Sequence, residues 1–231
     1  MARSIPDDRL ERLVECATKV FIAQGYQRTQ MADVATALGV AKGTLYLYVE
    51  SKDALFDLVA RCAAGDRRLL EAKRLPLPTP KAGATLRYAR EQLGKRQNLP
   101  KLAAALERAR VSDARSELEA IARELYETLH ANRTGIKLLD RSAPEHPELA
   151  AIWFKQGREG LLALLTAYIE SRIARGTFRS VPDVAVAARL ILETTVFWAV
   201  HRHWDPHPQQ IDESAAEATV VDLVVRLLLK E

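Results

Sequence analysis

Apolar side chains recur at helical spacing along almost the whole chain, and this periodicity constrains the fold more than any other feature. The first example is an i, i+3, i+4, i+7, i+11 stripe formed by Leu10, Leu13, Val14, Ala17 and Phe21. Such a stripe is one face of an amphipathic helix, here over about residues 8–24. No segment has the alternating pattern of a half-buried strand, and aromatic residues are only 6% of the chain. We therefore predict an all-α fold.

Glycine and capping residues divide the first part of this pattern into four expected helices. Gly25 is expected to end the first helix, because glycine readily adopts the left-handed conformation of a C-cap. Thr29 is the expected N-cap of a second helix, which Gly39 ends. A short third helix is expected over about 41–48. Ser51 is the expected cap of a fourth helix, over about 51–74.

Three prolines interrupt the helical pattern after this point. Pro76, Pro78 and Pro80 exclude a helix over 75–80, so this segment is predicted to be a linker. Beyond it, helices are expected over about 81–97, 101–109, 112–134, 148–174, 182–203 and 212–229.

Composition excludes several classes of protein. Cys16 and Cys62 lie far apart and form no C-x-x-C pair, which argues against a disulfide framework and favours a reducing, cytoplasmic location. No apolar run approaches the ~18 residues of a membrane span, so no membrane partner is expected. The N-terminus lacks the apolar segment of a secretory signal. The sequence contains no G-x-S-x-G, P-loop or G-x-G-x-x-G motif and no paired-carboxylate constellation, so we expect neither an enzyme nor a cofactor.

Positive charge is concentrated in the middle of the chain. The formal net charge is +4. Residues 1–53 are neutral overall, residues 54–115 carry 14 basic and 6 acidic side chains, and residues 116–231 have a net charge of −4. The excess has two interpretations: solvated helix faces, or a site for an anion such as an acidic effector. The neutral first segment argues against strong non-specific binding to polyanions.

The most informative stretch lies between residues 25 and 56. Two short helical patterns are joined by a tight turn at Leu38-Gly39-Val40, which is the arrangement of a helix-turn-helix. In the second helix Leu45 and Val49 can anchor the element to its neighbours. Lys42, Gly43, Thr44, Tyr46 and Tyr48 are left to project outward. Exposed tyrosines on a short helix suit contacts with phosphates and thymine methyl groups.

This stretch resembles the TetR family of transcriptional repressors. The motifs that carry the resemblance are G-Y-x-x-T-x-M-x-D-V-A, L-G-V, K-G-T-L-Y-x-Y and S-K-x-A-L-F, in order, within about residues 8–58. The resemblance implies a homodimer in which the third helix of each subunit reads one major groove of a palindromic double-stranded operator. The two half-sites would be separated by about 34–36 Å or a larger matching span.

The resemblance also implies roles for individual residues. Bases or adjacent phosphates would be contacted by Lys42, Gly43, Thr44 and Tyr46. Backbone phosphates would be bound by Thr29, Tyr48 and Lys52. Three positions depart from the family pattern: Ala41 replaces a frequent serine cap, Leu47 a frequent ring and Val49 a frequent phenylalanine. These differences affect operator choice and local packing rather than the fold.

The remainder of the chain contains no motif that identifies a function. The resemblance implies a domain over 54–231 that binds a small-molecule effector and dimerises, after a DNA-binding domain over 1–53, with the fourth helix connecting the two. The helix over 182–203 is apolar nearly all round, as expected for burial on two sides. Together with the helix over 148–174 it is our expected dimer interface. An alternative is that both are central helices of a monomer.

Three further functional readings stay open at this point. An effector could tighten DNA binding rather than release it, as in an activator or a regulator that requires a corepressor. His201, His203 and His207 lie near Asp205 and could belong to a metal-binding enzyme fused to a helix-turn-helix. Their spacing is not a recognised ligand pattern, so surface or interface histidines are the alternative. Redox sensing by Cys16 or Cys62 is the third.

Overall fold

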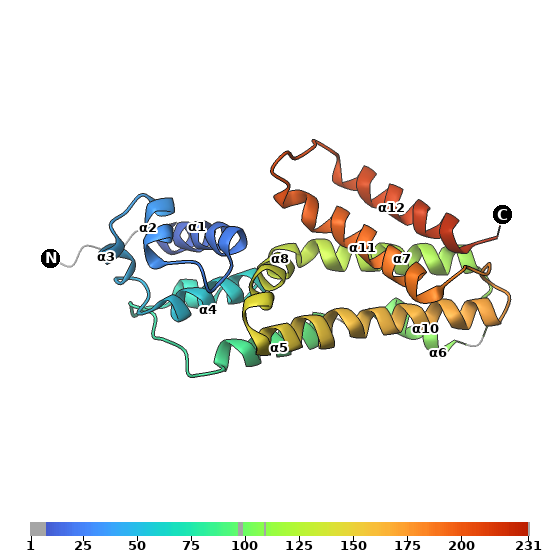
Figure 1. Cartoon of the computed structure of the whole chain (residues 1–231), viewed down its shortest axis with the longest axis horizontal. Helices are drawn as coiled ribbons and strands as arrows, with labels where there is room; N and C mark the ends of the chain where they lie inside the picture. Colours follow the sequence, from blue (N-terminus) through green and yellow to red (C-terminus); the bar gives the residue numbers. More distant parts are fainter. Residues whose placement is uncertain (1–7, 97–98, 109, 231) are drawn as a thin grey trace. The chain divides into compact units, whose positions relative to one another are not determined.

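The computed structural model describes residues 8–96, 99–108 and 110–230, and within them it is all-helical (Figure 1). The described part forms two compact units. Unit 1 comprises residues 8–92 and 134–153, and unit 2 comprises residues 93–133 and 154–230, each within its described residues. The predicted all-α class is confirmed. The predicted boundary between 53 and 54 stays a prediction.

Unit 1 is built around the four helices that the first part of the sequence predicts. Its helical elements are α1 (Asp8–Gln24), α2 (Met31–Leu38), α3 (Lys42–Leu45), α4 (Lys52–Ala63), η1 (Arg68–Glu71), most of α5 (Ala84–Arg96), α8 (Arg133–Ser142), η2 (Ala143–Glu145) and α9 (Pro147–Ala150). Helix α1 packs against α2 and α4, and α2 packs against α3. The core between them is apolar and fully buried, with Leu13, Phe21, Val34, Leu45, Leu55 and Leu58.

Unit 2 is a bundle of longer helices. Its elements are α6 (Pro100–Glu107), α7 (Ala114–Ala131), most of a π-helical segment η3 (Ala151–Glu159), α10 (Gly160–Ala174), α11 (Val184–Ala199), η4 (His201–Trp204) and α12 (Glu213–Leu228). Helix α7 packs against α6, α11 and α12, and α10 packs against α6 and α11 (Figure 1). The bundle encloses the side chain of Arg172, which donates to the Glu117 carboxylate at 2.8 Å and to the Ala105 carbonyl at 2.7 Å.

Several predicted boundaries agree with the structure. Helix α1 ends before Gly25, whose φ is +83°. Gly39 ends α2 with φ +73°, and the Ser51 side chain accepts a hydrogen bond from the Ala54 N–H at 3.1 Å to cap α4. The segment over 75–80 is not helical.

Other predicted boundaries are wrong. Helix α4 ends at Ala63 rather than near Arg74, because Gly65 turns the chain with φ +75°. The pattern over 148–174 is three segments, α9, η3 and α10, rather than one α-helix. One helix was expected over about 112–134, but α7 ends at Ala131 and α8 begins at Arg133, with only Asn132 between them. Apolar periodicity continues across these breaks, which is why it does not reveal them.

None of the described helices has both the length and the apolarity needed to cross a membrane.

Candidate nucleic-acid interface

The turn between α2 and α3 depends on the backbone conformation of Gly39. Its φ and ψ are +73° and +34°, in the left-handed region, and its N–H caps α2 by donating to the Ala35 and Thr36 carbonyls. No atom lies within 4 Å of where a Cβ would be. Glycine is therefore selected here for its φ and not for space.

Helix α3 presents one exposed face on a firmly anchored base. Leu45 and Val49 are fully buried, as the sequence predicts. Lys42 and Gly43 are exposed, Thr44 is half-buried, and Tyr46 is 41% exposed. These four residues include the donors, small side chain and aromatic ring that the sequence assigns to base contacts. Three of the four predicted base-contacting residues are therefore exposed, and the role in base contacts stays a prediction for all four.

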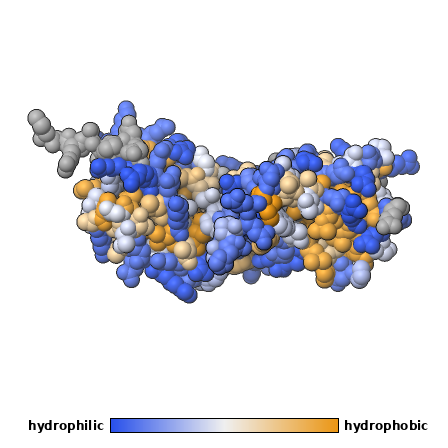
Figure 2. All heavy atoms as spheres, turned by 90° about the horizontal axis from the view of Figure 1, so that it is seen from above, coloured by the Kyte–Doolittle hydropathy of each residue, from blue (hydrophilic) through white to orange (hydrophobic). Residues whose placement is uncertain are grey.

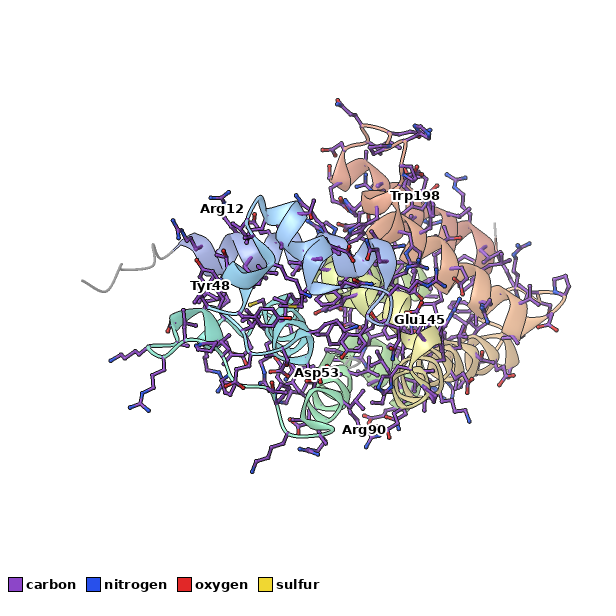
Figure 3. The ribbon with its side chains drawn as sticks, turned by 60° about the vertical axis from the view of Figure 1, so that its left-hand side comes forward. Arg12, Tyr48, Asp53, Arg90, Glu145 and Trp198 are labelled. Atoms are coloured by element: carbon purple, nitrogen blue, oxygen red, sulfur yellow. The ribbon has the colours of Figure 1, made fainter. Side chains whose placement is uncertain are left out.

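Tyr48 does not belong to that surface, and the prediction that it projects outward is wrong. Its side chain is only 4% exposed, whereas its neighbour Leu47 is largely exposed. Helix α3 ends at Leu45, and the next residues follow a turn in which the Tyr48 and Val49 N–H groups both donate to the Leu45 carbonyl. Tyr48 follows the buried Leu45 by three residues, so helical spacing itself places it beside Leu45 rather than on the outer face (Tyr48 is labelled in Figure 3).

Thr29 is also enclosed by the protein. Its hydroxyl donates to the Gly25 carbonyl at 2.7 Å in a buried position. The prediction that Thr29 is the N-cap of α2 is wrong, because Gln30 occupies that position. The Gln30 N–H donates to the Asp33 carboxylate at 2.8 Å, and the Asp33 N–H donates to the Gln30 carbonyl at 3.0 Å.

The ammonium group of Lys52 is committed to backbone carbonyls. Its Nζ donates to Tyr26 at 3.0 Å, Gln27 at 3.2 Å and Thr29 at 3.1 Å. An ammonium has three donors, so all of them are used. The same Nζ lies 4.5 Å from the centre of the Tyr26 ring. Lys52 thus fastens the first residue of α4 to the loop between α1 and α2.

A second set of contacts holds the same loop. The Tyr26 hydroxyl donates to the Asp53 carboxylate, and burial together with that carboxylate raises the pKa of Tyr26. Its ring packs 4.8 Å from Phe56. Glu145 in η2 accepts from the Gln27 N–H at 3.3 Å and pairs with Arg28 at 3.1 Å (Glu145 and Asp53 are labelled in Figure 3). The loop before α2 is therefore tied to both α4 and η2.

A small cavity lies beside this loop. Its volume is about 200 Å³, and its walls include Tyr26, Asp53, Lys81, Thr85 and His146. Among the residues that the structure describes, the buried His146 Nδ1 has no hydrogen-bond partner. Ligand sites for drug-sized molecules usually span about 300–1,000 Å³. The cavity is therefore small for an effector of that size.

The histidine-rich region of unit 2 forms an ion-pair network. Possible metal-ligand atoms of His130, His203 and Glu213 lie within 4.8 Å of one another, and within the described residues His201 and His207 do not join this group. Arg133 contacts the His130 Nε2 at 2.7 Å, and Arg202 pairs with Glu213. Guanidinium groups therefore already contact two of the three possible ligands, His130 and Glu213, which disfavours binding of a metal cation by them.

Unit 2 also exposes large apolar side chains on two helices that the sequence associates with dimerisation. They are Leu164 on α10 and Val186, Leu190 and Phe197 on α11. Apolar surface over this unit is visible on the right of Figure 2. Ala188, Ile191 and Thr195 of α11 are buried, so the exposed Val186, Leu190 and Phe197 lie on a different side of that helix. Apolar side chains thus lie on a buried and an exposed side of α11, and burial of the exposed side against a partner stays a prediction.

Comparison with known proteins identifies the family. The model of bacterial regulatory proteins of the tetR family matches residues 13–59, and that of the AefR-like transcriptional repressor C-terminal domain matches residues 116–227. The HTH-type transcriptional regulator YhgD of Bacillus subtilis is 44% identical over 50 residues, 22% of this chain and 26% of YhgD.

Two further relatives are similar over most of the chain. The HTH-type transcriptional repressor KstR2 of Rhodococcus jostii is 23% identical over 202 residues, 86% of this chain and 80% of that protein. The structure of the ketosteroid transcriptional regulator KstR2 of Mycobacterium tuberculosis has the same fold, with a TM-score of 0.58, 18% identity and 96% coverage of both chains. Together with the helix-turn-helix geometry of α2 and α3, these matches show that the chain belongs to the TetR family of bacterial transcriptional regulators.

Proposed function

We propose that this regulator is a dimeric, sequence-specific repressor that a small-molecule effector releases from a palindromic operator. The observation that carries the proposal is the exposed face of α3. Lys42, Gly43 and Tyr46 are exposed there and Thr44 is half-buried, while Leu45 and Val49 fix the helix in the core beneath them. A rigid base with a few exposed donors and a ring suits readout of base edges in a major groove.

The contacts divide by chemistry. Lys42 can donate to guanine acceptors or to a phosphate, and the Tyr46 ring can pack on a thymine methyl group. Gly43 permits close approach of the backbone. Because the side chains of Thr29, Tyr48 and Lys52 are engaged within the protein, we assign them the role of holding α2, α3 and α4 in position for DNA rather than direct phosphate contact.

Dimerisation is proposed through α10 and α11. Four large apolar side chains are exposed on these helices, and contiguous exposed apolar surface marks protein interfaces. Leu190→Glu should produce monomers, measured by light scattering during size-exclusion chromatography. Leu223→Glu on α12 is the matched control, because Leu190 and Leu223 are 54% and 52% exposed. Equal behaviour of the two variants would reject this interface.

The proposal that the protein represses rather than activates transcription is supported by its relatives and not by its geometry. The Rhodococcus protein is named as a repressor, and the matched C-terminal family model is described as that of a repressor. Effector release then follows from linkage, since DNA and effector would oppose each other reciprocally. A ligand that tightened DNA binding would indicate an activator or corepressor-dependent regulator instead.

The test is binding of fluorescent duplex DNA from upstream of the protein's own gene, followed by anisotropy. The wild type should bind this duplex far more tightly than a scrambled one. Tyr46→Ala should abolish the difference, and Tyr46→Phe separates the ring from its hydroxyl. Lys19→Ala, an exposed change on α1, is the control and should bind as the wild type does. Sequence-independent binding by all four proteins would contradict the proposal.

A further inference from the structure

The segment between α4 and α5 does not run directly from one helix to the next. After α4 ends, the chain passes through η1, and residues 72–80, here called the return segment, pass beside the connection from α3 to α4 (Figure 1). Leu77 is buried and forms a parallel bridge with Val49. The Leu77 N–H donates to the Tyr48 carbonyl at 2.8 Å, and the Glu50 N–H donates to the Leu77 carbonyl at 3.0 Å.

Side chains reinforce this docking. The Thr79 N–H donates to the Glu50 carboxylate at 2.8 Å, and the Thr79 hydroxyl donates to the Ser51 hydroxyl at 2.8 Å. Ser51 is itself the cap of α4. The return segment is thus fixed by backbone and side-chain bonds to the residues that directly follow α3. It is part of the helix-turn-helix surface and not a free linker.

The direction of the bridge determines which side the preceding residues occupy. Because Val49 and Leu77 pair in parallel, the residue directly before Leu77 lies at the end of the bridge from which the chain arrives from α3. Lys73 and Arg74 precede Leu77 by four and three residues. An extended chain covers at most about 3.6 Å per residue, so they lie within about 14 Å of Leu77. The two cations therefore belong to a short segment that is hydrogen-bonded to the residues directly after α3.

Both cations are available for a ligand. Lys73 and Arg74 are exposed, and in the described part of the chain neither forms an ion pair. Their basic neighbours differ, because Arg67 pairs with Glu11 and Arg68 pairs with Asp66. The return segment itself contains no acidic residue, and the carboxylate that contacts it, Glu50, is bonded to the Thr79 backbone.

The DNA-facing surface otherwise has few uncommitted cations. Lys52 has no free donor, and Arg28 is paired with Glu145. Phosphate contacts supply much of the affinity of protein–DNA complexes and fix register without reading sequence. We infer that Lys73 and Arg74 of the return segment form an additional phosphate-binding element, which grips the operator backbone beside the groove that α3 enters. This inference rests on the proposed function.

The test is the salt dependence of DNA binding by the full-length protein. The probe is the duplex recovered by the wild type from random-sequence DNA, with a scrambled duplex in parallel. The slope of log K against log salt is negative, and each lost phosphate contact makes it shallower by about 0.9. A dimer of Lys73→Gln/Arg74→Gln loses four contacts, so the magnitude of its slope should decrease by up to about 3.6. Affinity for both duplexes should fall by the same factor, leaving the specificity ratio unchanged.

Two further variants make the measurement decisive. Lys101→Gln/Arg110→Gln removes the same charge from exposed positions in unit 2 and should keep the wild-type slope. Lys73→Arg/Arg74→Lys keeps the charge and should therefore also keep the wild-type slope. All four cations are exposed, so each variant should unfold within about 0.5 kcal/mol of the wild type.

The outcomes separate the two levels of inference. Specific binding with an unchanged slope in Lys73→Gln/Arg74→Gln would overturn the phosphate-binding role and leave the proposed function intact. An equal fall of the slope in the unit 2 control would also overturn it, because the effect would then be general charge. Failure of the wild type to bind any duplex specifically would reject the proposed function, and the inference with it.

Discussion

Lys52 is the residue at which the structure most changes the functional expectation. The sequence assigns it to a DNA phosphate, whereas its ammonium donates to the carbonyls of Tyr26, Gln27 and Thr29. Lys52→Met keeps most of the aliphatic stem and removes these bonds. A hydrogen-bonded charged group contributes about 1.5–3 kcal/mol, and an exposed cation–π contact about 0.5–1 kcal/mol. Because water can reach part of this site, we expect a loss of about 2–3 kcal/mol in the free energy of unfolding.

The measurement is urea unfolding of unit 1. Trp153 is the only tryptophan of this unit, since Trp198 and Trp204 belong to unit 2. Replacing those two by phenylalanine makes Trp153 fluorescence a reporter of unit 1. Lys19→Met on α1 is the matched control, because it removes the same charge from an exposed position. It should change the free energy of unfolding by less than about 0.5 kcal/mol.

The opposite pattern would refute this reasoning. If Lys52→Met unfolds at the same urea concentration as Lys19→Met and lowers the salt slope of DNA binding by about 0.9 per protomer, the ammonium is free to bind phosphate. The contacts described here would then not hold it. A stability loss with an unchanged slope is the expected result.

Three further outcomes are expected from the structure. Arg172→Met leaves the Glu117 carboxylate without its buried partner and should cost unit 2 about 3–5 kcal/mol in urea unfolding, whereas Arg172→Met/Glu117→Gln should recover much of that loss. Burial, followed by Arg133 and Arg202, lowers the pKa of His203. The folded state therefore binds that proton less tightly, and unit 2 should lose stability as pH falls below about 6.5; His203→Gln should flatten this dependence in chemical denaturation series. Gly39→Ala places a residue with a side chain at a backbone φ of +73°. It should lower the free energy of unfolding by at least about 1 kcal/mol, measured as a lower melting temperature.

The parts of the fold that could be predicted are those with a local cause. Gly25 and Gly39 end helices because they take positive φ, and Ser51 caps α4 through its own hydroxyl. The exposed residues of α3 follow from the spacing of Leu45 and Val49, which must both be buried.

The parts that could not be predicted depend on contacts distant in sequence. The burial of Tyr48 is an exception, because its position three residues after Leu45 already places it on the buried side. Lys52 is engaged by carbonyls more than twenty residues away. The return segment has the prolines of a linker, but a buried Leu77 fixes it beside Val49. The one signal in the sequence is the excess of positive charge over 54–115, which includes Lys73 and Arg74 and for which the sequence allows two interpretations, solvated helix faces or a site for an anionic effector.

Selection from random-sequence duplex DNA tests the central claim most directly. The wild-type protein should enrich an inverted repeat, with half-sites about one helical turn or a multiple of it apart. Tyr46→Ala, which removes the exposed ring of α3, should enrich no sequence although it folds and dimerises. Enrichment of the same repeat by Tyr46→Ala, Lys42→Ala and the wild type would contradict the claim that this face of α3 reads the operator.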